Sequence, residues 1–260
     1  MTEDEVLGCA DENYFEAFRL VAHTAPRGDL YEDDELLLTS TGTTIEWLNI
    51  AFLKQPASDP LWAVQHAIDF YKRAGVPFIL RIREGVDAAA EEAAEALGLG
   101  YTDSVPGMVM EPIAAAPAQA DGLEIQTVSS AEAFADFARV AADCFQLDPV
   151  MTRDILSPSL LEQKDAHFYL GYVDGAPVAT SSLLVTARTA GVHYVATLDS
   201  HRKRGIGDAM TRHAVNEGAD AGAEIAALQS SDMGKPVYER MGFRVACDYK
   251  TFYNPAFLQS

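Results

Sequence analysis

The sequence of 260 residues is poor in cysteine, in basic residues and in long apolar runs. Its three cysteines, Cys9, Cys144 and Cys247, lie far apart and belong to no Cys-x-x-Cys or Cys/His cluster. We therefore expect no metal site and a reducing, cytoplasmic location. No run of about 18 apolar residues is present, which argues against a membrane-spanning helix. The acidic start, Met1–Glu5, differs from the basic start of a secretory signal.

Positive charge is scarce and unevenly placed. The chain has 19 Lys and Arg against 39 Asp and Glu, a net charge of −20. Residues 1–121 hold 22 acidic and 7 basic residues, and residues 122–260 hold 17 and 12. A nucleic-acid-binding protein needs a basic patch, so we expect no nucleic-acid partner. The acidity either keeps the protein in solution or attracts a cationic amine substrate, and the sequence leaves both readings open.

Apolar residues make up 48% of the chain, enough for two packed cores. The segment 112–121 is rich in proline and alanine and has no apolar periodicity, as expected of a linker. The sequence therefore predicts an N-terminal α/β domain at 1–111, a linker at 112–121 and a second domain at 122–260.

The second domain has a regular pattern of elements. Its apolar periodicity predicts helices at 134–145, 208–217 (stopped by Gly218) and 234–241, and strands at 123–128, 167–173, 176–185, 190–198, 224–229, 243–248 and 250–253. Asp174-Gly175 is a strong hairpin signal between two of the strands. Antiparallel strands followed by alternating helices and strands indicate a mixed sheet with helices on both faces, an α/β (α+β) fold. In the first domain the pattern predicts helices at 12–23, 62–74 and 87–97, and strands at 35–40, 43–53 and 77–83.

The most informative segment runs from His193 to Met210. An apolar strand ends in a polar turn that holds three cations and two glycines and leads directly into a helix. The first turn of a helix has N–H groups without intrahelical partners, and its dipole favours an anion. The segment therefore predicts a phosphate-binding turn. It is not a dinucleotide fingerprint, because Met210 stands where a third glycine is needed, and it lacks the Gly-Lys-Ser/Thr of a Walker loop.

Two motifs resemble those of the GCN5-related N-acetyltransferase (GNAT) superfamily. Residues 202–207 have the form Arg-x-x-Gly-x-Gly of its acyl-CoA pyrophosphate loop, and Val237-Tyr238 with Gly242-Phe243 resembles its downstream Leu-Tyr-x-x-x-Gly-Phe segment. The resemblance covers residues 123–253 and implies a GNAT fold and transfer of an acetyl group from acetyl-CoA to a primary amine within a ternary complex. It assigns cofactor binding to Val195, Ala196, Thr197, Arg202, Lys203, Arg204, Gly205, Ile206, Gly207 and Ser231.

The same resemblance suggests catalytic residues. Tyr238 would be the general acid that protonates the CoA thiolate, and packing of the helix end is its alternative role. The backbone N–H at Thr197 would polarise the thioester carbonyl. Ser231 stands where many family members have an asparagine. His193 is a candidate base, because strand alternation places it on the same face as Val195 and Thr197. A packed structural role for His193 is the alternative.

The first domain lacks the Arg-x-x-Gly-x-Gly loop. Its segment Leu97–Tyr101 parallels Arg240–Phe243, and aligning Gly100 with Gly242 puts Ala96 at the position of Tyr238. This half is therefore either a degenerate copy of the GNAT fold or an unrelated α/β domain. The whole chain is either an N-acyltransferase or a non-catalytic acyl-CoA-binding or protein-interaction module with a GNAT fold. The sequence identifies neither the acceptor, a small-molecule or peptide amine, nor the oligomeric state, monomer or homodimer.

Overall fold

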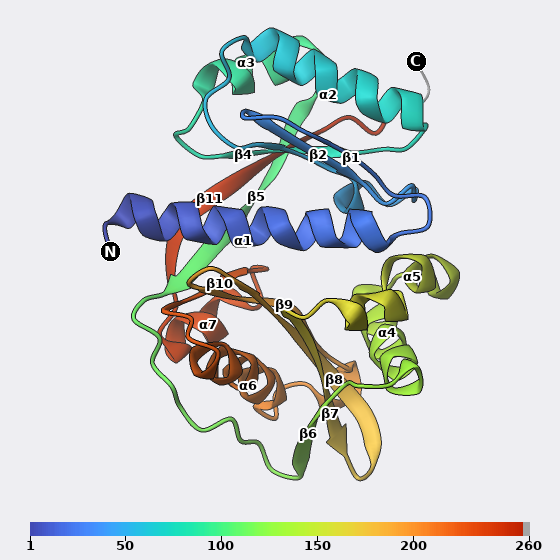
Figure 1. The fold of residues 1–260 in the computed structure, drawn as a ribbon, viewed down its shortest axis with the longest axis vertical. Helices are drawn as coiled ribbons and strands as arrows, with labels where there is room; N and C mark the ends of the chain where they lie inside the picture. The colour runs from blue at the N-terminus through green and yellow to red at the C-terminus, as the bar shows by residue number, and fades with distance from the viewer. Residues whose placement is uncertain (257–260) are drawn as a thin grey trace. The chain divides into compact units, whose positions relative to one another are not determined.

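A computed structural model describes residues 1–256 (Figure 1). The chain forms two compact units, unit 1 (Met1–Glu16 and Met108–Ala246) and unit 2 (Ala17–Gly107 and Cys247–Ser260). Three elements have residues in both units: helix α1 (Glu3–Thr24) and strands β5 (Gly100–Met110) and β11 (Arg244–Tyr253). Segment 112–121 follows β5, and its role as a linker between two folding domains stays a prediction. None of the helices described is long and apolar enough to cross a membrane.

The sheet of unit 1 is mixed. After the end of β5, its strands follow in the order β10 (Ile225–Gln229), β9 (Thr189–Thr197), β8 (Ala176–Thr186), β7 (Ala166–Val173) and β6 (Leu123–Thr127). Strands β6 to β9 are antiparallel neighbours, and β9 and β10 are parallel. The hairpin predicted at Asp174-Gly175 is confirmed, since both residues have positive φ, as a tight two-residue turn requires.

Helices cover both faces of this sheet. Adjacent residues of β7 point to opposite faces: Phe168 packs on Phe134 of α4 (Ala131–Phe145), and Tyr169 packs on His213 of α6 (Ile206–Asp220). Helix α7 (Lys235–Met241) contacts α6, and α5 (Pro149–Ile155) contacts α4. The predicted mixed sheet with helices on both faces is thus confirmed.

Two predicted boundaries in this unit are wrong. Helix α6 does not stop at Gly218 but continues to Asp220, and Gly222 follows it with a φ of 95°. Gly218 serves packing instead, because a Cβ there would overlap the Cβ of Ala190 on β9. The strands expected at 243–248 and 250–253 form the single strand β11.

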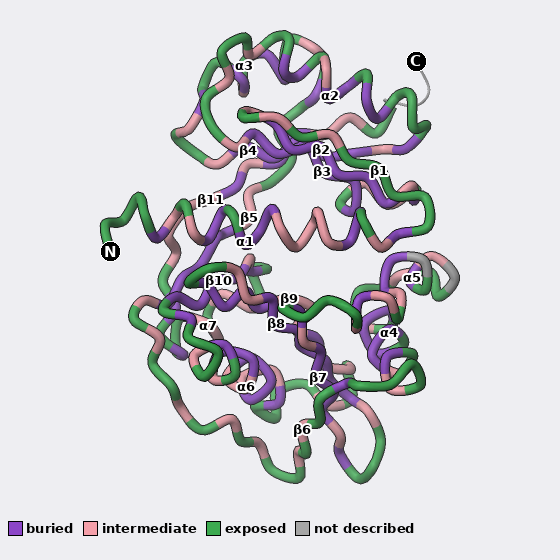
Figure 2. Tube along the Cα trace, viewed as in Figure 1, coloured by how far each residue is buried: buried purple, intermediate pink, exposed green. Residues whose placement is uncertain are grey.

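Unit 2 has its own sheet and core. Its strands follow in the order β1 (Asp29–Glu32), β2 (Leu36–Ser40), β3 (Ile50–Leu53), β4 (Ile79–Arg83) and the end of β11. Helices α2 (Pro60–Ala74) and α3 (Ala88–Ala96) pack on buried residues of these strands, among them Leu36, Leu38 and Leu80. Figure 2 shows β2, β3 and β4 as largely buried.

The strand predicted at 43–53 is mostly wrong. Only Ile50–Leu53 is extended as a strand, because buried Asn49 organises a turn before it. Its side-chain amide donates to the carbonyls of Thr43 (2.9 Å) and Pro77 (2.8 Å), and its Oδ1 accepts from the Thr41 N–H (2.9 Å). Strands β1 and β5 were not predicted.

Candidate functional site

Strand β9 contains a bulge in the segment that the sequence marks as functional. Ser182 of β8 pairs with His193, and Thr180 pairs with Ala196. Between these two pairs β8 has one residue and β9 has two, so β9 contains one extra residue. Tyr194 lies within the bulge with φ 50°, a conformation that is strained for an aromatic residue. The hydroxyls of Thr180 and Ser182 donate to the carbonyls of Tyr194 (2.7 Å) and His193 (3.2 Å). Side chains of β8 therefore hold this distortion in place.

The bulge overturns the expected side-chain alternation. Residues directly opposite each other in an antiparallel pair share a face, so His193 shares a face with Ala196 and not with Thr197 or Val195. The prediction that His193 faces the same side as Val195 and Thr197 is wrong, because one extra residue reverses the parity. His193 lies on the side that contacts Asn13 of α1.

Strands β9 and β10 part just before the bulge. Their parallel ladder joins 189–191 to 225–227, although β9 continues to Thr197 and β10 to Gln229. The main chain at Val195, Ala196 and Thr197 thus lies beyond the ladder to β10. An extended amide-containing ligand can pair with such a strand edge.

The turn that follows β9 is shaped for an anion. Arg202 Nε donates to the Thr197 carbonyl (3.2 Å) and its guanidinium pairs with Asp199 (2.8 Å), while Lys203 and Arg204 are exposed. Lys203 and Gly205 both have positive φ, 61° and 76°. Successive N–H groups in such a turn form a concave anion-binding surface.

Helix α6 begins at this turn without a side-chain cap. Its N-cap is Gly205, and apart from the neighbouring residues in the chain no atom of the described residues lies within 4 Å of the place that a Cβ would occupy there. A Cβ on Gly207 would lie 3.7 Å from Thr197 Oγ1, so the second glycine also leaves the helix end accessible. Ile206, by contrast, is buried and anchors the helix in the core. The helix N-terminus is therefore open toward solvent and suited to phosphate.

Tyr238 is linked to this turn through α6. It lies on α7, packs on Phe243 (ring centroids 5.9 Å apart) and has the side chain of Thr211 on α6 as a polar neighbour. The Thr211 hydroxyl donates in turn to the Gly207 carbonyl (2.9 Å). Burial raises the pKa of Tyr238 to about 12 against the lowering effect of Thr211. The phenol is therefore fully protonated at neutral pH.

Ser231 has a local structural partner. Its hydroxyl accepts from the Gly234 N–H (3.2 Å), and its carbonyl accepts from the N–H groups of Gly234 and Lys235 (both 3.0 Å). It thus shapes the turn before α7, and its contact with CoA stays a prediction.

His193 is half-buried and electrically neutral at physiological pH. Burial lowers its pKa to about 4. Its Nε2 lies 3.2 Å from Oδ1 of Asn13, which is 1% exposed. Sequence reasoning missed Asn13 because 180 residues separate the two positions, and no local motif marks a residue on an N-terminal helix as a partner of β9.

Cys144 lies half-buried on α4, and burial raises the pKa of its thiol to about 11. A thiol with so high a pKa is a poor nucleophile at neutral pH. We therefore interpret Cys144 as a packing residue of α4.

Comparison with known proteins supports these observations. Residues 164–245 match the family model described as Acetyltransferase (GNAT) domain. None of the curated proteins matches the chain in sequence.

Several solved structures resemble the chain. A GCN5-related N-acetyltransferase from Kribbella flavida has a TM-score of 0.74 at 20% identity, covering 95% of each chain. A tandem GNAT protein from the clavulanic acid biosynthesis pathway has a TM-score of 0.61 at 13% identity, covering 96% of this chain and 95% of that chain. A GCN5-related N-acetyltransferase from Sphaerobacter thermophilus has a TM-score of 0.61 at 19% identity, covering 74% and 66%.

At these identities the similarity shows the fold. Because two of the structures cover nearly the whole chain, the N-terminal half is GNAT-like in structure as well. The chain thus has a two-domain GNAT-like fold, and its residues 164–245 match the model of the GNAT acetyltransferase domain.

Proposed function

We propose that this protein transfers an acetyl group from acetyl-CoA to a primary amine, at a site built by β9, the turn at 202–207 and Tyr238. The observation that carries the proposal is the arrangement of β9 and α6. A bulged strand parts from its parallel neighbour and leads into a helix whose N-terminus is capped only by Gly205. An acyl donor with an amide-containing arm and a pyrophosphate fits both features.

Two parts of the site would hold the donor. The main chain of Val195, Ala196 and Thr197 would pair with the amides of the pantetheine arm, and the Thr197 N–H would polarise the thioester carbonyl. The N–H groups from Gly205 to Gly207 would bind the pyrophosphate, with Lys203 and Arg204 adding charge-assisted hydrogen bonds. Arg202, which is tied to Thr197 and Asp199, would brace the turn.

The reaction would proceed by direct attack. The amine nitrogen, in its neutral form, bonds to the thioester carbon, the C–S bond breaks, and the amine loses one proton as the amide forms. Tyr238 would donate a hydrogen bond, and then its proton, to the departing sulfur. Because a free thiol has a pKa near 8.5, well below that of the phenol, the hydrogen bond is the larger contribution of Tyr238 to stabilising the thiolate.

The second candidate is a non-catalytic acyl-CoA-binding module with the same fold. The low pKa of His193 favours it, because a base of that strength does not deprotonate an alkylammonium ion. Catalysis by His193 therefore requires the amine to enter neutral and to lose its proton only after the C–N bond has formed. Turnover with an amine separates the two candidates.

The first experiment is a calorimetric titration of acetyl-CoA into the wild type, Gly205→Glu and Gly222→Glu. Both glycines have positive φ and open surroundings, one before and one after the same helix. Each substitution therefore imposes similar strain, but only Gly205→Glu puts a carboxylate at the anion site. We expect binding by the wild type and by Gly222→Glu, and its loss in Gly205→Glu. Equal binding by both variants would refute the assignment of the site.

A further inference from the structure

We infer that Asn13 is a positioning residue that fixes His193 in its Nε2–H tautomer and thereby makes Nδ1 the atom that receives the proton of the acceptor amine. This inference rests on the proposed function and extends it to an element outside the matched family segment. Its basis is the hydrogen-bond pattern around one buried amide.

The orientation of the Asn13 amide is fixed by its partners. Its Nδ2 lies 2.8 Å from the Leu184 carbonyl and 2.8 Å from Thr186 Oγ1. A carbonyl oxygen can only accept, so the group facing Leu184 must be the NH₂ of the amide. Oδ1 therefore faces His193 Nε2, at 3.2 Å.

The state of the histidine follows from that orientation. Oδ1 is an acceptor, so Nε2 must carry the hydrogen to make this bond. A neutral imidazole has a single N–H, and burial keeps this ring neutral at physiological pH. Nδ1 therefore has the free lone pair, and it is the atom of His193 that can take a proton.

The surroundings of Asn13 hold it rigidly. The residue is 1% exposed, and a Cβ on Gly191 of β9 would overlap its Oδ1, so glycine at 191 is what admits the amide. The same helix is anchored to the sheet of unit 1 by Val6 and Ala10, which pack on Ile225 and Ala227. The N-terminal part of α1 is thus built against β9 and β10.

The proton transfer balances with the rest of the reaction. The neutral amine forms the C–N bond and becomes acidic in the tetrahedral intermediate, and Nδ1 of His193 accepts its proton. The C–S bond then breaks, and the thiolate is stabilised and protonated from Tyr238. The imidazolium returns its proton to the phenolate through solvent, which restores both groups and leaves the amide and the CoA thiol as products.

The tautomer can be measured without turnover. In long-range ¹H–¹⁵N spectra of ¹⁵N-histidine protein, His193 is the one of 6 histidines whose signals are absent in His193→Gln. We expect a protonated Nε2 and an unprotonated Nδ1 in the wild type. In Asn13→Leu, which keeps the approximate size of the side chain, we expect a mixture of tautomers. A protonated Nδ1 in the wild type, or an unchanged spectrum in Asn13→Leu, would overturn the inference.

Steady-state kinetics test the roles of His193 and Asn13 in catalysis. With an amine that the wild type acetylates, we expect kcat to fall about 100-fold in His193→Gln and about 10-fold in Asn13→Leu, with the KM for acetyl-CoA unchanged. Thr186→Val is the matched control, since it removes another partner of Asn13 without touching His193.

Failure of the positioning role of Asn13 and failure of the proposed acetyl transfer would give different results. Equal losses in Thr186→Val and Asn13→Leu would mean that Asn13 acts only on stability, which refutes the positioning role. Absence of turnover with every amine tested, together with the expected tautomer, would refute the proposed acetyl transfer and with it the role of Nδ1 as a base.

Discussion

The two units build the connection between a strand and the following helix in opposite ways. In unit 1, α6 begins at Gly205, without a side-chain cap and beside exposed cations. In unit 2, the connection from β3 to α2 is closed by the chain's own carboxylates. Asp59 caps α2 by accepting from the Trp62 N–H (3.0 Å), Glu35 accepts from Ser58 (3.0 Å), and Asp87 accepts from Ala57 (2.8 Å).

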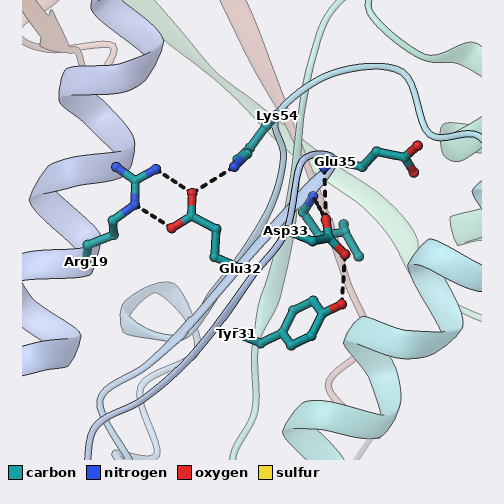
Figure 3. Close-up of polar contacts among 7 residues, drawn as sticks. Arg19, Tyr31, Glu32, Asp33, Glu35 and Lys54 are labelled. Atoms are coloured by element: carbon teal, nitrogen blue, oxygen red, sulfur yellow. Dashed lines mark hydrogen bonds and ion pairs between the residues drawn. The ribbon is translucent and has the colours of Figure 1, made fainter.

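The cation of the connection from β3 to α2, Lys54, is also neutralised. Lys54 Nζ lies 2.7 Å from Glu32, which accepts from Arg19 as well (Figure 3). A phosphate would have to displace three carboxylates from these N–H groups and compete with Glu32 for Lys54. Part of the acidity of the N-terminal half therefore serves to satisfy the N–H groups and the cation of this connection.

The strands before the two connections also differ, since those of unit 2 are regularly paired and those of unit 1 are not. The pairing of β2 with β3 runs without interruption from Leu36–Leu53 to Thr39–Ile50, whereas that of β8 with β9 is broken by the bulge at Tyr194. The parallel ladder of β3 and β4 reaches Phe52, one residue from the end of β3, whereas β9 runs six residues beyond its ladder. Among the parallel strands that the structure describes, only those of unit 1 therefore have a long edge outside their ladder.

The largest expected effect concerns Tyr238. Its structural counterpart in unit 2 is Ala94, because the Leu99 N–H donates to the Ala94 carbonyl (2.9 Å) as the Phe243 N–H donates to the Tyr238 carbonyl (3.0 Å), so the alignment of Gly100 with Gly242 was wrong. We expect Tyr238→Phe to lower kcat for acetyl transfer by about 100- to 1000-fold, because the sulfur loses its hydrogen-bond donor, with acetyl-CoA affinity nearly unchanged. Steady-state thiol release and calorimetry would measure the two quantities. Ala96→Tyr is the control and should leave the activity unchanged. Full activity in Tyr238→Phe would show that another group serves the sulfur.

Acid should weaken unit 1 through His193. Its pKa in the folded protein is about 4 against 6.5 when unperturbed, so the unfolded chain binds more protons between these values. The stability present above pH 6.5 is therefore lost as the pH falls toward 4, by up to about 3 kcal/mol. Urea unfolding of wild type and His193→Gln at pH 7 and pH 4 would measure the difference. An equal pH dependence in both proteins would contradict a neutral buried ring.

A buried cation should weaken unit 2. Arg81 on β4 lies opposite Phe52 of β3 and Thr251 of β11 in the sheet and is 8% exposed. Among the residues described, its Nε and Nη1 have no hydrogen-bond partner, and neither does Thr251 Oγ1. At the matching position of the ladder, unit 1 has Ala227.

We expect Arg81→Met to raise the free energy of unfolding by about 1–3 kcal/mol, because it removes an uncompensated buried charge. Arg73→Met, on the exposed side of α2, should change it by less than about 0.5 kcal/mol. Both values come from denaturant unfolding. Destabilisation by Arg81→Met would show instead that the guanidinium has a partner in solution.

The smallest effect concerns the connection from β3 to α2. Asp59→Ala should cost about 1 kcal/mol of stability through the loss of the N-cap of α2. The stoichiometry of acetyl-CoA, which we expect to be one per chain, should not change, because Glu35 and Asp87 still occupy the connection. Binding of a second equivalent of acetyl-CoA by Asp59→Ala would show that the Asp59 carboxylate alone keeps acetyl-CoA from binding to unit 2.

Local signals predicted much of this molecule. The glycine turn at 202–207, the hairpin at Asp174-Gly175 and most helices could be predicted, because each depends on residues close in sequence. The bulge at Tyr194 could not, since it depends on hydroxyls of β8 that become neighbours only in the sheet. The predicted face of β9 for the His193 side chain was wrong for this reason. Gly218 looked like a helix stop because its packing partner, Ala190, is distant in the chain.

Helix α1 and strand β11 have a consequence for biosynthesis. Unit 1 includes residues 1–16 but is complete only when residue 246 has been made, and unit 2 still needs β11, which pairs with β4 through Tyr249 to Phe252. Neither unit can therefore finish folding on the ribosome before the residues of β11 have emerged. We expect partly synthesised chains to expose the unpaired edge of β4, which makes them natural clients of chaperones that shield nascent strands.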